Sequence, residues 1–227
     1  MRQISTSASI RAYLLDLVYL NATLTAGDHI SLATRVQAEI ETVRAERAEL
    51  ERAEELEVIA QAFIAGRDVT LDTGLIEAGK FVRAHHPEEY KALFPKAPSD
   101  IAVSAYRAEI ANVRTVVAKL DQLPDNDSVR GEFSPRLAAA AAALETSIEE
   151  KEDVSRGVAL VRLKLEKRRA AVNLLRTEIY ADLLKLMKAK RTADRYFRTG
   201  STSKKDDADE PATPAPTDTP VVPPVVP

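Results

Sequence analysis

The adjacent pair His85 and His86 is the part of this sequence whose residue types most readily suggest metal binding or proton transfer. Neighbouring residues of a helix point about 100° apart, so two such side chains seldom bind the same ion. No aspartate or glutamate stands three residues before a histidine, as the Glu-x-x-His motif of di-iron bundles requires. We therefore interpret the pair as part of a polar turn before Pro87.

Motifs for phosphate binding and covalent catalysis are missing too. Gly74 and Gly79 have the wrong spacing for a phosphate loop, and Lys80 is followed by Phe81 rather than by a hydroxyl residue that would bind magnesium. No serine lies in a nucleophile-elbow pattern. Cysteine is absent, which removes disulfides, thiolate metal sites and thiol catalysis. The sequence predicts a protein that is not an enzyme and has no cofactor or metal.

Basic side chains are the remaining group with a chemical use, because they can bind phosphates of nucleic acids or an anionic membrane surface. Segment 155–198 holds thirteen basic and four acidic residues. The candidate interaction residues are three arginines that recur every seven residues and five basic residues that follow them: Arg162, Arg169, Arg176, Lys188, Lys190, Arg191, Arg195 and Arg198. Alternatively they pair with Glu39, Glu46 and their neighbours. We favour pairing, because residues 1–198 hold 30 basic and 30 acidic residues.

The last segment, 200–227, is rich in proline and threonine and has no set of residues able to form a core, so we expect it to be disordered or extended. Its candidate docking residues are the prolines of two Pro-x-x-Pro repeats: Pro220, Pro223, Pro224 and Pro227. An extended peptide with this spacing can dock into an aromatic groove. A plain spacer is the alternative that we favour.

The basic residues must be positioned by the longest helical pattern, 134–198. Ser134 can cap a helix and Pro135 suits its first position. One position of a seven-residue repeat is apolar with a single exception, Lys151, and its other members are Leu137, Leu144, Val158, Leu165, Val172, Ile179 and Leu186. The repeat keeps its phase across Asp153 and Gly157, which favours a continuous or gently kinked helix. Unbroken, these residues would span about 98 Å.

A second long helix is expected over residues 29–65, ending at Gly66. Its apolar positions fall on one side at spacings of three, four or seven residues. Segment 28–66 holds nine acidic and four basic residues, whereas the last helix is strongly basic. Opposite charge and comparable length predict that the two helices lie antiparallel. Apolar burial must hold them, because surface ion pairs contribute only about 0–1 kcal/mol each.

The rest of the sequence predicts shorter helices. We expect one at 10–24, an irregular segment with short helices at about 67–99, and one from Ser99 or Asp100 to Gln122. Residues 1–199 would form one helical bundle. The predicted fold is all-α: an elongated helical bundle with long coiled-coil-like helices and a disordered C-terminal tail.

These patterns favour a non-catalytic scaffold, adaptor or structural component of a larger assembly, which binds protein partners or itself through helices. The alternatives are a nucleic-acid-binding protein that uses the basic last helix, and an assembly chaperone that holds a partner helix against the first helix. The apolar run 12–20 is interrupted by Asp16 and is too short to span a bilayer. With no signal peptide recognised and no cysteine, we expect a cytoplasmic location.

Overall fold

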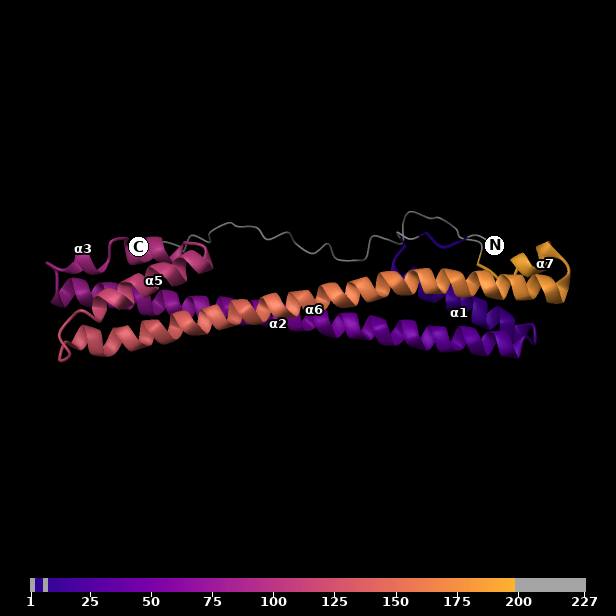
Figure 1. The fold of residues 1–227 in the computed structure, drawn as a ribbon, viewed down its shortest axis with the longest axis horizontal. Coiled ribbons are helices and arrows are strands. Elements are labelled where there is room, and N and C mark those ends of the chain that lie inside the picture. Colours follow the sequence, from indigo (N-terminus) through magenta and orange to yellow (C-terminus); the bar gives the residue numbers. More distant parts are fainter. Residues whose placement is uncertain (1–2, 6–7, 199–227) are drawn as a thin grey trace, which may run out of the picture. The chain divides into compact units, whose positions relative to one another are not determined.

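The computed structural model describes residues 3–5 and 8–198, and within them the chain is helical with no strand (Figure 1). The described residues form seven helices: α1 (Ile10–Ala26), α2 (Ile30–His85), α3 (Tyr90–Leu93), α4 (Pro98–Ala102), α5 (Tyr106–Leu120), α6 (Ser128–Met187) and α7 (Lys190–Asp194). The predicted all-α class with long helices is confirmed. No helix among the described residues has the length and apolar character needed to cross a membrane.

Helices α2 and α6 have 56 and 60 residues. At about 1.5 Å per residue they are about 84 Å and 90 Å long. The chain divides into two compact units, and each long helix contributes to both. Within the described chain, the first unit contains residues up to Glu54 and from Gly157 onward, and the second contains Glu55–Arg156.

The core of the first unit is built from α1, the start of α2, the end of α6 and the segment around α7. Ser9 begins α1, and its hydroxyl accepts from the Ala12 N–H at 3.3 Å. Most of the buried core is aliphatic, and it consists of Tyr13, Leu17, Leu20, Leu24, Leu32, Ala33, Val36, Ile40, Val43, Val172, Ile179, Leu183, Ala193 and Phe197. The Thr23 hydroxyl donates to the Tyr196 carbonyl at 2.9 Å, which ties the end of α1 to the residues after α7.

The core of the second unit joins the end of α2, the short helices α3 and α4, α5 and the start of α6. Its buried residues are Ile64, Leu71, Leu75, Ala78, Val82, Leu93, Phe94, Ile101, Ile110, Val113, Val116, Leu120, Val129, Phe133, Leu137, Ala141 and Leu144. The α2 members recur at three, four or seven residues, so one side of α2 faces this core.

Helices α2 and α6 are antiparallel in each unit, as the opposite charges predicted. In the first unit, Arg35 pairs with Glu178 at 2.7 Å and Glu54 pairs with Arg162 at 2.8 Å. In the second unit, the Ser155 hydroxyl donates to Glu57 at 2.6 Å and Arg136 pairs with Glu77 at 2.7 Å. In both cases the residue number rises along one helix as it falls along the other.

The expected end of the second helix at Gly66 is wrong, because α2 continues to His85. The irregular segment expected at 67–99 is correspondingly shorter. Gly74 and Gly79 are buried where other elements approach α2: a Cβ at Gly74 would lie 3.4 Å from Leu137, and one at Gly79 would lie 2.5 Å from Pro98. Burial of the side chains on either side of these glycines offsets the lower helix propensity of glycine.

The expected start of the long basic helix at Ser134 is also wrong. Helix α6 begins at Ser128, and the Asp127 carboxylate accepts from the Val129 N–H at 2.8 Å. Pro135 therefore lies inside the helix, where its side chain is exposed. The carbonyl four residues earlier belongs to Gly131, which is exposed as well, so water can replace the bond that proline removes. The helix is continuous through Gly157.

The long helix ends earlier than expected, at Met187 rather than at Arg198. Lys188 has a φ of 53°, a left-handed conformation that stops the helix, and α7 follows. Leu186 was expected in the apolar repeat but is 61% exposed, whereas Leu183 is buried. The other apolar members of that repeat are buried.

The helix expected from Ser99 to Gln122 is interrupted. Helix α4 ends at Ala102 and α5 begins at Tyr106. The Ser104 hydroxyl donates to the Ile101 carbonyl at 2.6 Å, a local bond that replaces the helical one. The predicted disordered tail, 200–227, lies outside the described residues.

Two glycine substitutions in α2 should have opposite effects on stability. Gly66→Ala should raise the free energy of unfolding by up to about 1 kcal/mol, because a Cβ there meets no atom of the described residues within 4 Å and alanine is the better helix former. Gly79→Ala should lower it, because overpacking against Pro98 costs about 1–3 kcal/mol and outweighs the helix preference. Thermal and urea denaturation measure both, and equal shifts of the two variants would contradict this packing.

Candidate functional site

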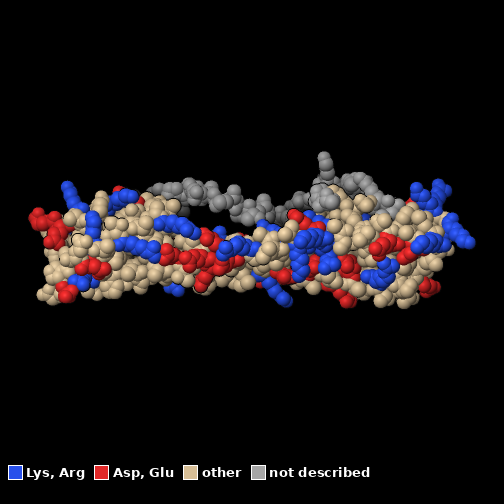
Figure 2. All heavy atoms as spheres, in the orientation of Figure 1, with Lys and Arg blue, Asp and Glu red and all other residues tan. Residues whose placement is uncertain are grey.

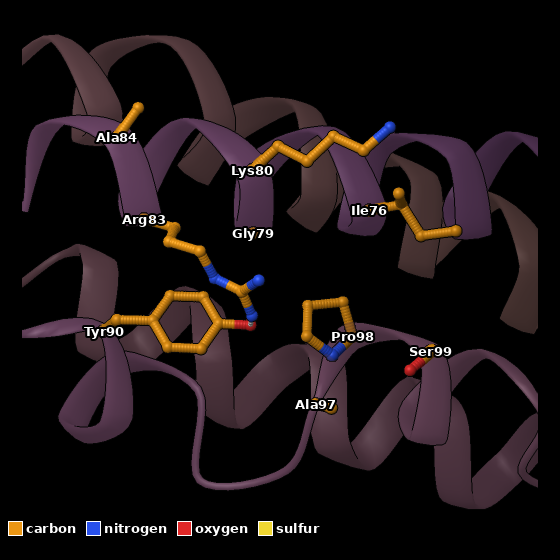
Figure 3. A pocket seen from close by; sticks show the side chains of 9 residues that line it. All are labelled: Ile76, Gly79, Lys80, Arg83, Ala84, Tyr90, Ala97, Pro98 and Ser99. Atoms are coloured by element: carbon orange, nitrogen blue, oxygen red, sulfur yellow. Dashed lines mark hydrogen bonds between the residues drawn. The ribbon is translucent and has the colours of Figure 1, made fainter. Parts of the chain in front are cut away.

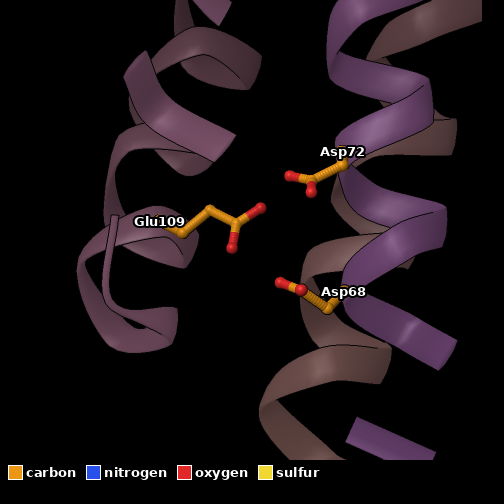
Figure 4. A group of neighbouring side chains, drawn as sticks. All are labelled: Asp68, Asp72 and Glu109. Atoms are coloured by element: carbon orange, nitrogen blue, oxygen red, sulfur yellow. The ribbon is translucent and has the colours of Figure 1, made fainter. Parts of the chain in front are cut away.

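Three carboxylates converge between α2 and α5 in the second unit (Figure 4). Asp68 and Asp72 lie one turn apart on α2, so both point toward the same neighbour. Glu109 comes from the first turn of α5 and points back between them. One oxygen from each carboxylate lies within 4.8 Å of the others. We call these three residues the acidic cluster.

Glu109 is the most unusual member of the acidic cluster, because its side chain has no exposed surface. Neither of its carboxylate oxygens has a hydrogen-bond donor among the described residues. The pKa of Glu109 is raised from 4.5 to about 9, mainly by burial and also by the neighbouring Asp68 and Asp72, which hydrogen-bond to the protonated form and repel the charged form. The N-terminal end of α5 favours a negative charge, but burial and the two aspartates outweigh it.

Asp68 and Asp72 are half-buried, and burial raises the pKa of each. No lysine or arginine contributes to the pKa shifts of the acidic cluster among the described residues. Nearby arginines on α5 pair elsewhere: Arg107 with Glu152 at 2.6 Å, and Arg114 with Glu145. The acidic cluster can therefore hold a proton, and its oxygens are of the type that bind hard cations.

Sequence reasoning missed the acidic cluster. The predicted helix ended at Gly66, so Asp68 and Asp72 were not expected to lie on one helical face. At the start of α5 the apolar residues Ala105 and Ala108 are exposed, whereas Glu109 is buried. A signal was present, because Glu109, Val113, Val116 and Leu120 follow one another at four, three and four residues.

The structure separates the three arginines that recur every seven residues. Arg162 is exposed and pairs with Glu54 at 2.8 Å, Arg169 is half-buried, and Arg176 is buried. The Arg176 guanidinium lies 3.6 Å from Asp16 and 5.6 Å from the centre of the Phe197 ring. Because Arg176 is only 2% exposed, these arginines do not form one row for phosphates.

Arg168 makes the ion pairs that connect the basic helix with Glu39 and Glu46. Its Nε and Nη2 donate to the two oxygens of Glu46 at 2.9 and 2.7 Å, and Nη1 donates to Glu39 at 3.3 Å. Glu46 is only 4% exposed, so this two-pronged pair is shielded from water. Elsewhere on the visible face, basic and acidic side chains are interspersed (Figure 2).

The five remaining basic candidates lie at and around α7. Lys188, Lys190, Arg191, Arg195 and Arg198 are all exposed. The charge of Arg198 lowers the pKa of Asp16, although burial raises it more. The tail candidates Pro220, Pro223, Pro224 and Pro227 lie outside the described residues.

A shallow pocket of about 420 Å³ lies between α2 and the short helices α3 and α4 (Figure 3). Arg83 partly fills it: the guanidinium lies 4.6 Å from the centre of the Tyr90 ring and donates to the Tyr90 hydroxyl at 3.1 Å. The two histidines are near but face different partners. His85 stacks on Phe81 at 4.0 Å, and His86 Nε2 lies 3.2 Å from Asp127.

Comparison with known proteins gives no relative. No protein-family model matches this sequence, no curated protein is significantly similar to it, and no solved structure matches it.

Stability should fall as pH rises from about 4.5 to about 9, because folding raises the pKa of Glu109 over this range. The folded chain then binds more protons than the unfolded chain, and raising the pH favours the unfolded chain. The raised pKa values of Asp68 and Asp72 act in the same direction. Urea denaturation at several pH values, with a chelator present, measures the slope.

Glu109→Gln is the matched variant, because it keeps the shape of the side chain and removes its titration. Its free energy of unfolding should depend less on pH and should exceed that of the unchanged chain at pH 9. Identical slopes for the two chains would contradict the burial of an uncompensated carboxylate.

Proposed function

We propose that this protein is a non-catalytic helical scaffold or structural component of a larger assembly, and that it acts by self-association through helices. The observation that carries the proposal is a row of exposed apolar side chains on α2. Leu56, Ile59 and Phe63 are 55%, 50% and 57% exposed. Their spacing of three and four residues places them on one face of the helix. We call them the α2 row.

The α2 row lies on a different face from the side of α2 that is already packed. In the same segment, Ala60 and Ile64 are buried. Glu57 accepts a hydrogen bond from Ser155 of α6. Fully burying an exposed leucine, isoleucine or phenylalanine side chain contributes about 1.5–3 kcal/mol. These three are already about half covered, so covering the rest would be worth about 2–5 kcal/mol before the cost of association.

A second copy of this chain is the occupant that we propose for the α2 row. Each copy carries the same row, so a two-fold contact would place one row against the other. Over this segment α2 packs on α6, and two such pairs would make a four-helix arrangement of the kind that long amphipathic helices form. The proposal includes a cytoplasmic location, which the absence of cysteine supports.

Ile59→Glu and Phe63→Glu should each weaken self-association at least tenfold, because each places a charge in the contact on both copies and removes the apolar burial there. Light scattering during size-exclusion chromatography and sedimentation velocity measure the mass of the full chain against concentration. A chain that remains monomeric at every concentration tested would reject self-association through this row.

Val58→Glu is the control for these variants. Val58 is 71% exposed on the same helix but points about 100° away from Ile59. The Val58→Glu substitution adds the same charge and should leave self-association unchanged. An equal loss of self-association in the control would mean that added charge, and not the α2 row, controls the association. Circular dichroism should show the same helix content for all these exposed substitutions.

Nucleic-acid binding is the second candidate, and the exposed basic residues at α7 favour it. These five charges lie within Lys188–Arg198. The negative C-terminal end of a helix favours basic residues in its last turn, but it does not require five of them. The pairing of Arg162 and Arg168 with glutamates restricts this candidate to the end of the described chain.

Replacement of Lys188, Lys190 and Arg191 by glutamate tests this candidate. If the chain binds DNA or RNA, the affinity of the unchanged protein should fall as salt rises, and the triple variant should lose most of it. Fluorescence anisotropy with a labelled oligonucleotide measures both. Absence of binding at low salt would reject nucleic acid as a partner.

A further inference from the structure

We propose that Asp68, Asp72 and Glu109 bind one hard divalent cation, such as Mg²⁺, Mn²⁺ or Ca²⁺, between α2 and α5 (Figure 4). All three residues belong to the second unit. The cation would connect the two helices at the start of α5, where Glu109 lies in the first turn. This proposal is independent of self-association through the α2 row.

The spacing of the acidic cluster fits a single ion. Oxygen ligands lie about 2.1 Å from Mg²⁺ and about 2.4 Å from Ca²⁺, so oxygens on opposite sides of one cation are about 4.2–4.8 Å apart. The three ligand oxygens of the acidic cluster all lie within 4.8 Å of one another. Three oxygens that were all 4.8 Å apart would lie about 2.8 Å from their common centre, so small side-chain rotations would bring all three to one ion.

The burial of Glu109 is the observation that points to a ligand. Its side chain has no exposed surface and is directed at the two aspartates, yet no described residue donates a hydrogen bond to either of its oxygens. An unpaired buried carboxylate is costly, because it loses its hydration without a compensating partner. Acidic groups at the surface keep their hydration, so they need no ion to compensate their charge.

A proton satisfies the acidic cluster only in part. One proton on Glu109 donates to one aspartate oxygen, and it leaves the charges of Asp68 and Asp72 close together. The Asp72 Oδ1 atom is also buried without a donor. A divalent cation would accept electron pairs from all three groups at once and would neutralise two of the three negative charges.

The ligand set defines the class of ion. The group contains carboxylates only, with no histidine within ligand distance among the described residues. Oxygen ligands select hard cations rather than zinc or copper. Asp68 and Asp72 are half-buried, so the ion could enter from their side and keep water in its other positions.

Titration of the full chain with Mn²⁺ tests the proposal after removal of metals by a chelator. Electron paramagnetic resonance measures free Mn²⁺, and thermal denaturation in Mn²⁺, Mg²⁺ or Ca²⁺ measures stabilisation. We expect saturable binding of one Mn²⁺ per chain, competition by one of the other ions, and a melting temperature that rises with ion concentration. No saturable binding would overturn the proposal and leave a proton as the occupant.

Glu109→Gln and the double variant Asp68→Asn, Asp72→Asn should each weaken Mn²⁺ binding at least tenfold and abolish the rise in melting temperature. The double variant changes half-buried groups, so it tests the site even if Glu109→Gln alters folding. The control is Glu149→Gln with Glu150→Gln, which removes two exposed charges from α6 of the same unit. Equal weakening in the control, or unchanged binding in Glu109→Gln, would overturn the site.

Discussion

The apolar contact between α2 and α6 is the interaction on which the other elements depend. A helix of 56 or 60 residues cannot cover its own apolar side, so each needs the other in both units. A buried leucine or valine contributes about 1.5–3 kcal/mol, whereas an exposed ion pair contributes about 0–1 kcal/mol. Apolar burial therefore holds the helices together. Shielded pairs such as Arg168 with Glu46 favour one alignment over its neighbours.

The smaller helices cover the parts of the hydrophobic cores that α2 and α6 do not cover. Helix α1 adds Tyr13 and Leu17 to the core of the first unit, and α5 adds Val113 and Val116 to the core of the second. Close approach requires small residues at particular points, and Gly79 against the Pro98 ring is one of them. Helix propensity alone predicts an interruption there, but the buried neighbours along α2 outweigh a cost of about 1 kcal/mol.

Two buried ionisable groups have opposite surroundings. Arg176 lies against Asp16 and the Phe197 ring, and burial lowers the pKa of its guanidinium although Asp16 opposes this shift. Among the described residues, the charged groups that shift the pKa of Glu109 are carboxylates, so every cause raises it. The first arrangement compensates a buried charge in part within the chain. The second leaves a charge that a proton or a cation must compensate, which is why the acidic cluster stands apart from the other carboxylates as a candidate site.

The sequence by itself determined the helical class and the two long amphipathic helices, because periodicity is a local property of a segment. Their opposite charges and comparable lengths predicted the antiparallel pairing. The sequence did not determine where those helices begin and end. Gly66, Pro135 and Ser134 carry strong local signals, but buried neighbours and the Asp127 cap decided the boundaries. Only the tertiary structure placed Glu109 beside Asp68 and Asp72. Residues about 40 positions apart in the chain meet through packing, and no spacing rule within one helix describes such a contact.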